Sequence, residues 1–553
     1  FIMYENNRIK VTNTAIIVDN YDLHSCEELE RPFMSYDPIR HKSEMKLLHY
    51  DEENKRLYIP GGYDIWRVRK ALDEKYYTRI APTPYKFMEG NIMINAKPRD
   101  EYQVEALNFM CSLNGYEDNA SLSQLTLALN TGKGKSYCSI FTMGYYRIRS
   151  MVITNSNSLL SQWESEITKY TNIPQNKIVR ISGSDYCNMI LNGTSGKANN
   201  GFIYLCSHGT LRSFGERYGW DKVTQLFEYL GIGIKFFDEC HLAFENMFLI
   251  DYYTNVYKTF YVSATPGRSD WKENRMFQIS LKNVPMIDLF DENNDPHTSY
   301  VAIKWNSNPS PQQLHACRHP VYKFDRNKYV DYVTKKPEFY DMLRIIMDLV
   351  KRAISDGGRV LIYIGTNEGV LRVYKWIADN YREYICDIGI FTSLVSKEEK
   401  LKEKQKKILL STTKSAGVGE HINNLKMTVV LAEPFKSEVL ARQTLGRTRD
   451  DNTMYIHCVD MAFVYIKKFY YNTRHVFEKY ALDTSESPID SYELRRRAQI
   501  LEEERDIGWR YHPISLYDNR FDFDKLGIEP KETPGPKCPI KIFPKKKGDI
   551  FHK

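Results

Sequence analysis

The sequence of 553 residues lacks the apolar run of about 20 residues that a membrane-spanning helix requires. Its first residues, Phe1, Ile2 and Met3, lack a basic segment followed by an apolar core, so no secretory signal is predicted. An excess of one charge is also missing, because 77 basic residues against 70 acidic ones leave a net charge of only +7. This balance does not by itself indicate a nucleic-acid partner. Membrane, collagenous and wholly disordered classes are excluded, and a soluble multidomain protein is expected.

Paired cysteines are missing as well. The ten cysteines are scattered, and no two have the CxxC spacing of a zinc ribbon or a redox site. The nearest approach to a metal cluster is His315-Ala-Cys317-Arg-His319, whose alternate residues would share one strand face. No second ligand cluster lies nearby in the sequence, so an ordinary surface or core segment is the favoured interpretation.

What the sequence does contain is two blocks in which short apolar runs alternate with helical stretches. This pattern is typical of parallel sheets covered by helices on both faces, and it predicts an α/β fold class. The strands predicted for the first block are 125–129, 151–154, 202–206, 234–237 and 259–262. The strands predicted for the second block are 359–364, 388–391, 407–411, 427–431 and 453–457.

The segments outside these blocks differ in character. Residues 45–50 and 56–60 flank a polar turn and predict a hairpin, with a helix after it from about 63 to 75. A charged helix is predicted over 493–505, before a proline- and lysine-rich tail. The predicted domains are a small α+β N-terminal domain (1–97), a first lobe (98–305), a connection (306–335), a second lobe (336–482), and a charged helix with a basic tail (483–553).

A candidate phosphate-binding loop follows the first predicted strand, in Leu129-Asn-Thr-Gly132-Lys-Gly134-Lys135-Ser136. The glycines allow backbone N–H groups to turn toward phosphate oxygens, and the N-terminus of the following helix adds a favourable dipole. Lys135 would lie near the β- and γ-phosphates, and Ser136 would ligate Mg²⁺. The strict pattern has glycine where this chain has Leu129. On this segment alone, a lysine-rich turn stays open as the alternative.

Two adjacent carboxylates end another predicted strand, in Ile234-Lys-Phe-Phe-Asp238-Glu239-Cys240-His241. Asp238 at the tip of the strand can hold Mg²⁺, and Glu239 can act as a general base toward water. An acidic strand end that merely caps a helix is common. It is the weaker interpretation here, because the pair follows a phosphate-binding loop by about a hundred residues.

The run Asp-Glu-Cys-His resembles motif II of superfamily 2 helicases, and segments resembling the other motifs occur in the family's order. Before it come Arg99-Asp-Glu-Tyr102-Gln103 (adenine recognition), Leu159-Leu-Ser-Gln162-Trp163 (motif Ia) and Ser207-His208-Gly-Thr210-Leu211 (motif Ib). After it come Ser263-Ala264-Thr265 (III), Val360-Leu-Ile-Tyr-Ile-Gly-Thr366 (IV), Ser411-Thr-Thr413-Lys-Ser-Ala-Gly417-Val-Gly-Glu420 (V) and Gln443-Thr-Leu-Gly446-Arg447-Thr-Arg449 (VI). The resemblance spans roughly residues 98–465.

Within this superfamily the sequence is most similar to UvsW-type DNA helicases of phages and their relatives in large DNA viruses. The similarity rests on Leu129, on the Gln162-Trp163 pair and on the run Ala264-Thr-Pro-Gly-Arg268-Ser. The predicted hairpin and the run 57–62 also resemble the small domain that precedes the motor in that group. The resemblance implies a cytoplasmic protein, in the host cytoplasm if a phage encodes it.

The resemblance implies two tandem RecA-like lobes that bind ATP and Mg²⁺. On the first lobe, nucleotide binding carries over to Arg99, Tyr102, Gln103, Thr131, Gly132, Lys133, Gly134, Lys135, Ser136 and Tyr137. Lys135, Asp238 and Glu239 carry over as catalytic residues, and Ser136 and Asp238 as metal ligands. On the second lobe, Gly417 and Glu420 carry over to nucleotide binding, and Gln443, Arg447 and Arg449 to catalysis.

Two departures from the family pattern affect the second lobe. The family has a second motif VI arginine where this chain has Asp450, so the adjacent Arg449 is the expected substitute. In motif V, the usual Gly-Leu-Asp-Ile becomes Gly417-Val-Gly-Glu420-His-Ile422. The role of the motif V carboxylate in coupling is therefore left open.

Nucleic-acid contacts are expected on both lobes, mainly to the sugar–phosphate backbone. The candidates are Gln162, Trp163, Ser207, His208, Thr210, Thr366, Ser393 and Thr413. Trp163 would either stack on a base or pack against its own lobe, and packing is the more common outcome for such an aromatic. Tyr102 would likewise either stack on the adenine or pack.

The function that this resemblance implies is that of a monomeric, ATP-dependent DNA helicase. It would unwind or branch-migrate replication, repair and recombination intermediates, with branched, duplex or single-stranded DNA as partner. An RNA-directed helicase is the alternative, because these motifs do not separate DNA from RNA. A nuclease motor is weaker, since the candidate cleavage site, Asp524 with Glu529-Pro-Lys531, is interrupted by proline. The tail lysines either grip duplex DNA or remain solvated.

Overall fold

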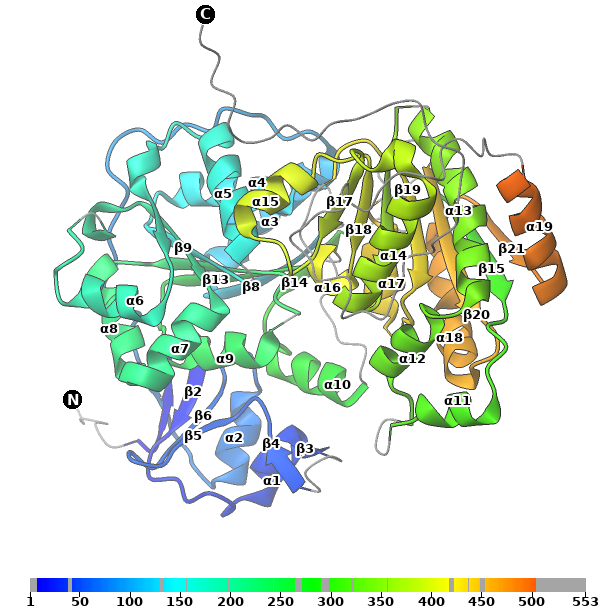
Figure 1. Cartoon of the computed structure of the whole chain (residues 1–553). Coiled ribbons are helices and arrows are strands. Elements are labelled where there is room, and N and C mark those ends of the chain that lie inside the picture. Colours follow the sequence, from blue (N-terminus) through cyan, green and yellow to red (C-terminus); the bar gives the residue numbers. More distant parts are fainter. Residues whose placement is uncertain are drawn as a thin grey trace, which may run out of the picture. The chain divides into compact units, whose positions relative to one another are not determined.

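The structure is a computed structural model, and the chain divides into two compact units, residues 1–294 and 295–553 (Figure 1). The described residues are 7–37, 42–129, 133–155, 157–196, 198–241, 243–263, 271–289, 298–319, 323–355, 357–416, 422–435, 437–447 and 453–503. Within these ranges, no helix is both long enough and apolar enough to cross a membrane.

The first unit begins with a small five-stranded sheet of strand order β5-β6-β2-β1-β7. Its strands are β1 (Ile9–Val11), β2 (Ala15–Val18), β5 (His49–Asp51), β6 (Arg56–Pro60) and β7 (Thr78–Arg79). The predicted hairpin is present as β5 and β6, which pair antiparallel with His49 opposite Tyr58. Helix α2 (Ile65–Ala71) follows the hairpin and begins at Asp64, whose carboxylate accepts the N–H of Trp66.

One part of the hairpin prediction is wrong. The sequence predicts a strand over 45–50, but the strand of the hairpin begins only at His49. The preceding β4 (Lys42–Met45) pairs instead with β3 (Met34–Asp37), after α1 (Glu27–Glu30) and the 3-10 turn η1 (Arg31–Phe33). Leu47, between the two strands, has a φ of +62°, a turn conformation that ends one strand before the next begins.

The main sheet of the first unit has seven parallel strands in the order β10-β11-β9-β12-β13-β8-β14. The strands are β8 (Gln124–Leu129), β9 (Ser150–Thr154), β10 (Ile178–Ile181), β11 (Ile203–Ser207), β12 (Ile234–Asp238), β13 (Lys258–Ser263) and β14 (Met286–Leu289). The α-helices are α3 (Glu101–Cys111), α4 (Lys135–Tyr146), α5 (Asn157–Tyr170), α6 (Ser184–Leu191), α7 (His208–Tyr218), α8 (Trp220–Leu230), α9 (Phe244–Tyr252) and α10 (Trp271–Ser280). Short 3-10 turns are η2 (Glu117–Ser121), η3 (Gln175–Lys177) and η4 (Ala198–Asn200).

Helices cover both faces of this sheet, and alternate strand residues show it. In β9, Val152 packs in a core with α3, α4 and α5, whereas Met151 and Ile153 pack in a second core with α6 to α9. Because successive strand residues point to opposite faces, continuous apolar runs are needed on strands buried on both sides. The second core also contains the apolar residues of the small N-terminal sheet.

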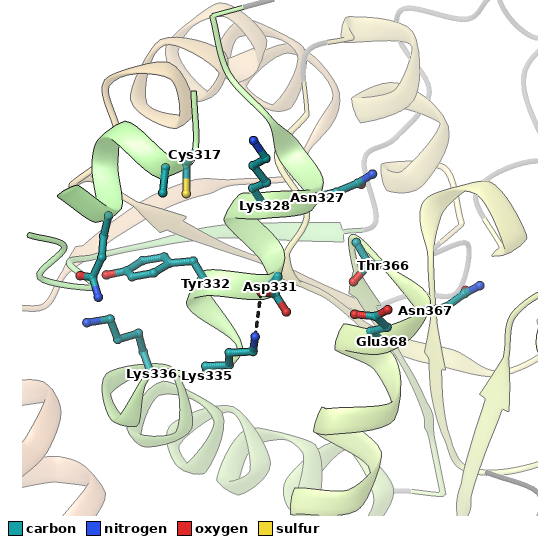
Figure 2. A pocket seen from close by; sticks show the side chains of 12 residues that line it. Cys317, Asn327, Lys328, Asp331, Tyr332, Lys335, Lys336, Thr366, Asn367 and Glu368 are labelled. Atoms are coloured by element: carbon teal, nitrogen blue, oxygen red, sulfur yellow. Dashed lines mark hydrogen bonds and ion pairs between the residues drawn. The ribbon is translucent and has the colours of Figure 1, made fainter. Parts of the chain in front are cut away.

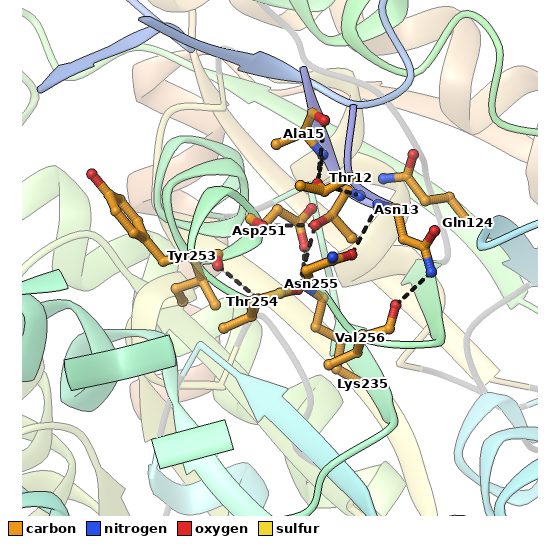
Figure 3. Close-up of polar contacts among 12 residues, drawn as sticks. Thr12, Asn13, Ala15, Gln124, Lys235, Asp251, Tyr253, Thr254, Asn255 and Val256 are labelled. Atoms are coloured by element: carbon orange, nitrogen blue, oxygen red, sulfur yellow. Dashed lines mark hydrogen bonds and ion pairs between the residues drawn. The ribbon is translucent and has the colours of Figure 1, made fainter. Parts of the chain in front are cut away.

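The N-terminal sheet is tied to the main sheet by a buried polar network (Figure 3). The Thr14 hydroxyl donates to the backbone oxygen of Asp251 at 2.8 Å. Asn13 donates through its backbone N–H to the Asn255 side-chain oxygen and through its side-chain amide to the backbone oxygens of residues 256 and 257. Beneath them, Lys235 Nζ lies 2.5 Å from Asp251 Oδ1, and both side chains are fully buried. The Tyr261 hydroxyl donates to the other carboxylate oxygen at 2.6 Å. The first unit is therefore built as one body, with the N-terminal sheet as part of it.

The second unit contains another seven-stranded parallel sheet, in the order β17-β18-β16-β19-β20-β15-β21. The strands are β15 (Thr298–Trp305), β16 (Arg359–Ile364), β17 (Ile388–Phe391), β18 (Ile408–Ser411), β19 (Leu425–Ala432), β20 (Thr453–Asp460) and β21 (Thr484–Pro488). The helices are α11 (Pro311–Ala316), α12 (Arg326–Val333), α13 (Pro337–Ser355), α14 (Asn367–Asn380), α15 (Lys397–Glu403), α16 (Thr413–Ala416), α17 (Glu438–Leu445), α18 (Val464–Tyr480) and α19 (Ser491–Glu503), with a 3-10 turn η5 (Arg382–Tyr384).

All ten predicted strands of the two blocks are present, and the predicted α/β class with two RecA-like parallel sheets and a small N-terminal α+β part is confirmed. The boundaries of the second lobe differ from the prediction. Residues 298–305, predicted for the first lobe, form β15, which pairs with β20 in the second sheet. Residues 484–488 form β21 on the other side of β15, so the second sheet extends beyond 482.

Two further predictions on the second unit also need correction. The connection 306–335 is not mainly loop, because it contains α11 and α12. The segment from His315 to Cys317 lies at the end of α11 and not on a strand, so its alternate residues do not share a strand face. The tail lysines and the segment with Asp524 and Glu529 lie outside the described residues.

Candidate functional site

The predicted phosphate-binding loop lies between β8 and α4. Gly134 immediately precedes α4 with a φ of +92°, in the left-handed region that favours glycine. A Cβ at this position would lie 2.3 Å from Gln103 Nε2, so the Gln103 side chain would have to move away from the loop. Helix α4 begins without a hydrogen bond from a side-chain cap, which leaves its first N–H groups available to an anion. Thr131 and Gly132 lie outside the described residues.

Lys135, the first residue of α4, points toward the carboxyl ends of two strands. Its Nζ lies 3.4 Å from the backbone oxygen of Leu129 at the end of β8 and 3.5 Å from Glu239 Oε1 just after β12. Ser136, the next residue of the helix, is half-buried. The structure therefore brings the lysine of the loop and one carboxylate of the Asp238-Glu239 pair together in one site.

Gln103 connects the predicted adenine motif to the phosphate-binding loop. Its amide oxygen accepts the Arg99 N–H at 2.8 Å, and its amide nitrogen donates to the Lys133 backbone oxygen at 2.8 Å. Asp100 caps α3 by accepting the Gln103 N–H at 2.9 Å, so the helix start orients the side chain. Gln103 is only 4% exposed. Its visible role is to hold the loop.

Other residues predicted near the nucleotide surround this loop. The ammonium group of Lys133 lies 5.2 Å from the centre of the Tyr102 ring, a cation–π distance. Arg99 is exposed and pairs with Asp100, while the Tyr137 hydroxyl donates to the Ala96 backbone oxygen at 3.0 Å. Tyr102 is half-buried, with its ring packed against the core on one side and near Lys133.

The positions of the two carboxylates are set by the end of β12. Asp238 is the last residue of this central strand, and Glu239 has a φ of +50°, a conformation that is uncommon outside glycine. Both residues are 8% exposed. Burial raises the pKa of Asp238 to about 6, and the charge of Glu239 adds to the rise, whereas the Trp163 hydrogen bond and Lys135 lower it.

His241 connects this pair to the next strand. Its Nδ1 lies 2.8 Å from Ser263 Oγ at the end of β13 and 3.5 Å from Glu239 Oε2. The parallel order β12-β13 in the sheet places these strand ends side by side. Ala264 and Thr265, which complete the predicted motif III, lie outside the described residues.

Trp163, which the sequence analysis lists as a candidate nucleic-acid contact, lies beside the carboxylate pair. Its indole N–H donates to Asp238 Oδ2 at 2.9 Å, and the side chain is 3% exposed within the core formed with α3, α4 and α5. A ring so buried offers no face to a nucleic-acid base, so of the two outcomes predicted for Trp163 the structure has packing against its own lobe, and not an exposed ring. No spacing in the sequence indicates the bond, because it depends on how α5 packs on the sheet.

A second predicted nucleic-acid contact is also buried. The His208 ring stacks on Phe237, with centroids 5.5 Å apart, and burial lowers the pKa of His208 to about 4. His208, the first residue of α7, therefore packs against β12 with its ring buried. Ser207 caps α7 by accepting the Thr210 N–H at 3.2 Å, and the two hydroxyls lie 3.0 Å apart. Gln162 is half-buried on α5 and donates to Glu166 at 2.8 Å.

In the second unit, the predicted contacts cluster at the carboxyl ends of neighbouring strands. Thr366 caps α14 by accepting the Gly369 N–H at 3.1 Å, and Asn367 donates to the exposed Ser393 hydroxyl at 2.9 Å. Thr413 is different, because it is buried and its hydroxyl donates to Glu433 at 3.0 Å. A nucleic-acid contact through Thr413 would have to break that bond.

The residues predicted in motif VI lie on and just after α17. Gln443 and Arg447 are both described and both buried, and Arg447 follows the end of the helix at Gly446. Arg449, Gly417 and Glu420 lie outside the described residues, so their predicted roles stay predictions.

The second unit also has a cavity of about 1090 Å³, and Thr366 is one of the residues that line it (Figure 2). It is lined by Gln313, Ala316, Cys317, Asn327, Lys328, Asp331, Tyr332, Lys335, Lys336, Thr366, Asn367 and Glu368. The negative charge of Asp331 is balanced by ion pairs of its two carboxylate oxygens with Lys335 and with the buried Arg372, each 2.8 Å long. The three lysines are spread around the cavity and do not converge on one point (Figure 2). Among these residues, sequence reasoning named Thr366 as a nucleic-acid contact and Cys317 only within the rejected metal cluster.

Comparisons with known proteins bear first on the first unit. Residues 96–268 match the family model described as type III restriction enzyme, res subunit, and this segment contains the phosphate-binding loop and the Asp238-Glu239 pair. The match supports an ATPase domain of the superfamily 2 helicase type. No curated protein matches the sequence.

Several solved structures are similar to this chain at low sequence identity. The crystal structure of T4 UvsW is 14% identical, over 87% of this chain and 99% of that one, with a TM-score of 0.33. DEAD-box helicase Mss116 bound to ssRNA and UDP-BeF is 14% identical, over 72% of this chain and 77% of that one, with a TM-score of 0.49. S. cerevisiae Dbp5 bound to RNA and ADP BeF3 is 13% identical, over 73% and 97%, with a TM-score of 0.45. The ligands of these structures are properties of those proteins.

Proposed function

We propose that this chain is an ATP-dependent DNA helicase or translocase of the UvsW-like type, acting on branched replication and recombination intermediates of a phage or large DNA virus. The observation that carries the proposal is the contact between the loop lysine and the strand-end carboxylate, with Lys135 Nζ 3.5 Å from Glu239 Oε1. These residues are 104 positions apart in the sequence. The contact supports the proposal because Lys135 would bind a terminal phosphate and Glu239 would activate water beside it.

The donor set of the first unit fits a magnesium–nucleotide complex. The uncapped N-terminus of α4 and the Lys135 ammonium group suit phosphate oxygens, and the Ser136 hydroxyl and the Asp238 carboxylate are oxygen donors of the kind that Mg²⁺ prefers. Bound Mg²⁺ would neutralise charge that develops on the phosphates. Glu239 would accept the proton of the attacking water, and His241 holds its far oxygen.

Arg447 and Arg449 are proposed to stabilise the charge of the transition state, and Gln443 is proposed to assist them. Arginine is suited to this role because its planar guanidinium remains charged and binds phosphate oxygens bidentately. Gly417 and Glu420 are proposed to contact the nucleotide.

The nucleic-acid backbone is proposed to contact hydroxyls and amides of both units. Gln162 is the partly exposed candidate on the first unit, and Thr366 and Ser393 are the candidates on the second. Ser207 and Thr210 are buried, so their hydroxyls would have to be uncovered before they could contact the backbone. The cavity that Thr366 lines would extend the nucleic-acid surface of the second unit, and its Lys328, Lys335 and Lys336 would bind phosphates. Contacts on both units are what a motor that steps along a strand needs. The motor is proposed to act as a monomer in the host cytoplasm.

The proposal is tested by ATP hydrolysis with forked DNA, single-stranded DNA, single-stranded RNA or no nucleic acid in one assay. Forked DNA is expected to stimulate hydrolysis most, and a strand-separation assay on the same fork is expected to require ATP. If RNA alone stimulates hydrolysis, the proposed substrate is wrong and the substrate is RNA.

A further inference from the structure

The hydrogen bond between Trp163 and Asp238 connects two parts of the first unit that the proposed function uses separately. Trp163 lies on α5, directly after Gln162, the proposed nucleic-acid contact of that helix. Asp238 lies at the end of β12 and is the proposed metal ligand. The donor and acceptor atoms are 2.9 Å apart, and both side chains are buried. One bond therefore joins the helix that would contact nucleic acid to the carboxylate that would hold Mg²⁺.

The geometry of this bond makes it a firm support for the carboxylate. The indole ring packs in the core against residues of α4 and of the sheet, so the direction of its N–H is set by the position of α5. The indole engages Oδ2 of Asp238, and Oδ1 is the oxygen that it leaves to a ligand. A short hydrogen bond to a carboxylate is strongly directional, so it holds the rotamer of the side chain.

The surroundings of Asp238 explain why such a support is needed. Glu239, the next residue, is buried beside it, and its charge opposes that of Asp238. Glu239 itself is held by Lys135 and His241, at 3.5 Å each. Among the side chains that the structure describes, Trp163 is the one that donates a hydrogen bond to Asp238.

We propose that Trp163 is a positioning residue, which holds Asp238 in its metal-binding orientation and couples that orientation to nucleic-acid binding at α5. The inference rests on the proposed function. When nucleic acid binds beside Gln162 and shifts α5, the indole N–H moves with the helix and the Asp238 carboxylate follows. Nucleic-acid stimulation of ATP hydrolysis then has a physical path within the first unit, from α5 to the end of β12.

The test replaces only the hydrogen-bond donor. β-(3-Benzothienyl)alanine at position 163 has sulfur in place of the indole N–H and keeps the shape of tryptophan, and Trp163→Phe is the genetic counterpart. The matched control is the same replacement at Trp305, which is 1% exposed and whose indole N–H has no hydrogen-bond partner among the described residues. Thermal unfolding of each variant shows whether the fold is retained.

Three quantities are measured on the full chain: the Mg²⁺ concentration for half-maximal ATP hydrolysis, Mn²⁺ binding by electron paramagnetic resonance with a non-hydrolysable ATP analogue, and affinity for single-stranded DNA. The replacement at 163 is expected to weaken metal binding about 10–100-fold, the range for groups that orient a metal ligand. It should also remove DNA stimulation and leave DNA affinity unchanged. The replacement at 305 should change none of these.

The outcomes separate this inference from the proposed function. Normal metal affinity in the folded position-163 variant would overturn the positioning role. Weakened metal binding with full DNA stimulation would overturn the coupling. A wild-type chain that neither hydrolyses ATP nor binds DNA would instead overturn the proposed function, and the inference with it.

Discussion

At the scale of single residues, the sequence predicted where the candidate residues lie on strands and helices more reliably than it predicted their contacts. The Lys135 and Asp238-Glu239 predictions rest on loop and strand-end patterns, and both segments lie where the patterns require. Trp163 and His208 were predicted to contact nucleic acid, but both are buried. A motif gives the residue type, whereas the choice between an inward and an outward side chain depends on helix packing, which local sequence does not specify.

Lys135→Ala is expected to lower ATP hydrolysis by about 10²–10³-fold, because the charge that stabilises the transferred phosphate is removed. The unfolding temperature should stay close to that of the wild type, since among the described residues the Lys135 side chain makes one backbone contact, to Leu129, and one ion pair. Phosphate release and thermal unfolding check this, with Lys222→Ala on α8 as the control. Normal hydrolysis by the Lys135 variant would show that this loop is not the phosphate site.

The pH dependence of hydrolysis should reflect Asp238. Its pKa is raised to about 6, mainly by burial, and protonation at lower pH removes the negative charge that a metal ligand needs. We therefore expect hydrolysis at limiting Mg²⁺ to fall as pH decreases through about 6. Saturating Mg²⁺ should move this fall to lower pH, because metal and proton compete for the same carboxylate. An unchanged rate from pH 7.5 to 5 at both Mg²⁺ concentrations would contradict this assignment.

At the scale of elements, strands with a continuous apolar run were predictable, including the edge strand β17, whereas edge strands without such a run were not. The missed β14 alternates exposed and half-buried residues at the edge of its sheet, and β21 is the polar run Thr484–Pro488 at the edge of the other. Neither has the continuous apolar run that indicates a covered strand. β15 alternates buried residues such as Tyr300 with half-buried ones such as Lys304, and its partners β20 and β21 lie far along the chain.

The buried pair beneath the N-terminal sheet should matter for stability. Lys235→Met would leave Asp251 charged, fully buried and without its cation, which is expected to cost about 3–5 kcal/mol of unfolding free energy. Lys235→Met combined with Asp251→Asn should cost less, because the uncompensated charge is gone and Tyr261 keeps an acceptor. Urea unfolding measures the difference.

The control for this comparison is Arg352→Met, which breaks an exposed ion pair on α13 and should cost no more than about 1 kcal/mol. Equal losses in the Lys235 single variant and in this control would contradict the argument.

The cavity beside α12 gives a prediction for nucleic-acid binding. Replacing Lys328, Lys335 and Lys336 by alanine should weaken single-stranded DNA binding and reduce the slope of log affinity against log salt by about 2, as expected for three lost phosphate contacts. The control replaces the exposed lysines of α18, Lys467, Lys468 and Lys479. An equal salt dependence in both variants would place the DNA elsewhere.

At the scale of the whole molecule, the sequence predicted two parallel α/β sheets and an N-terminal α+β part, and the structure contains all three. The boundary between the units was less predictable, because β15 precedes its own unit's other strands and pairs with β20 more than 140 residues later. The net charge of +7 agrees with a chain that binds nucleic acid through local groups. Such a chain can release its partner in every cycle.

The central claim is that the chain couples ATP hydrolysis to DNA. Its most direct test is the steady-state rate of phosphate release by the full chain with Mg²⁺ and ATP, measured with and without forked DNA and compared with Lys135→Ala. The account predicts hydrolysis that forked DNA stimulates and that the Lys135 variant lacks. A wild-type rate equal to that of the Lys135 variant, with and without DNA, would contradict it.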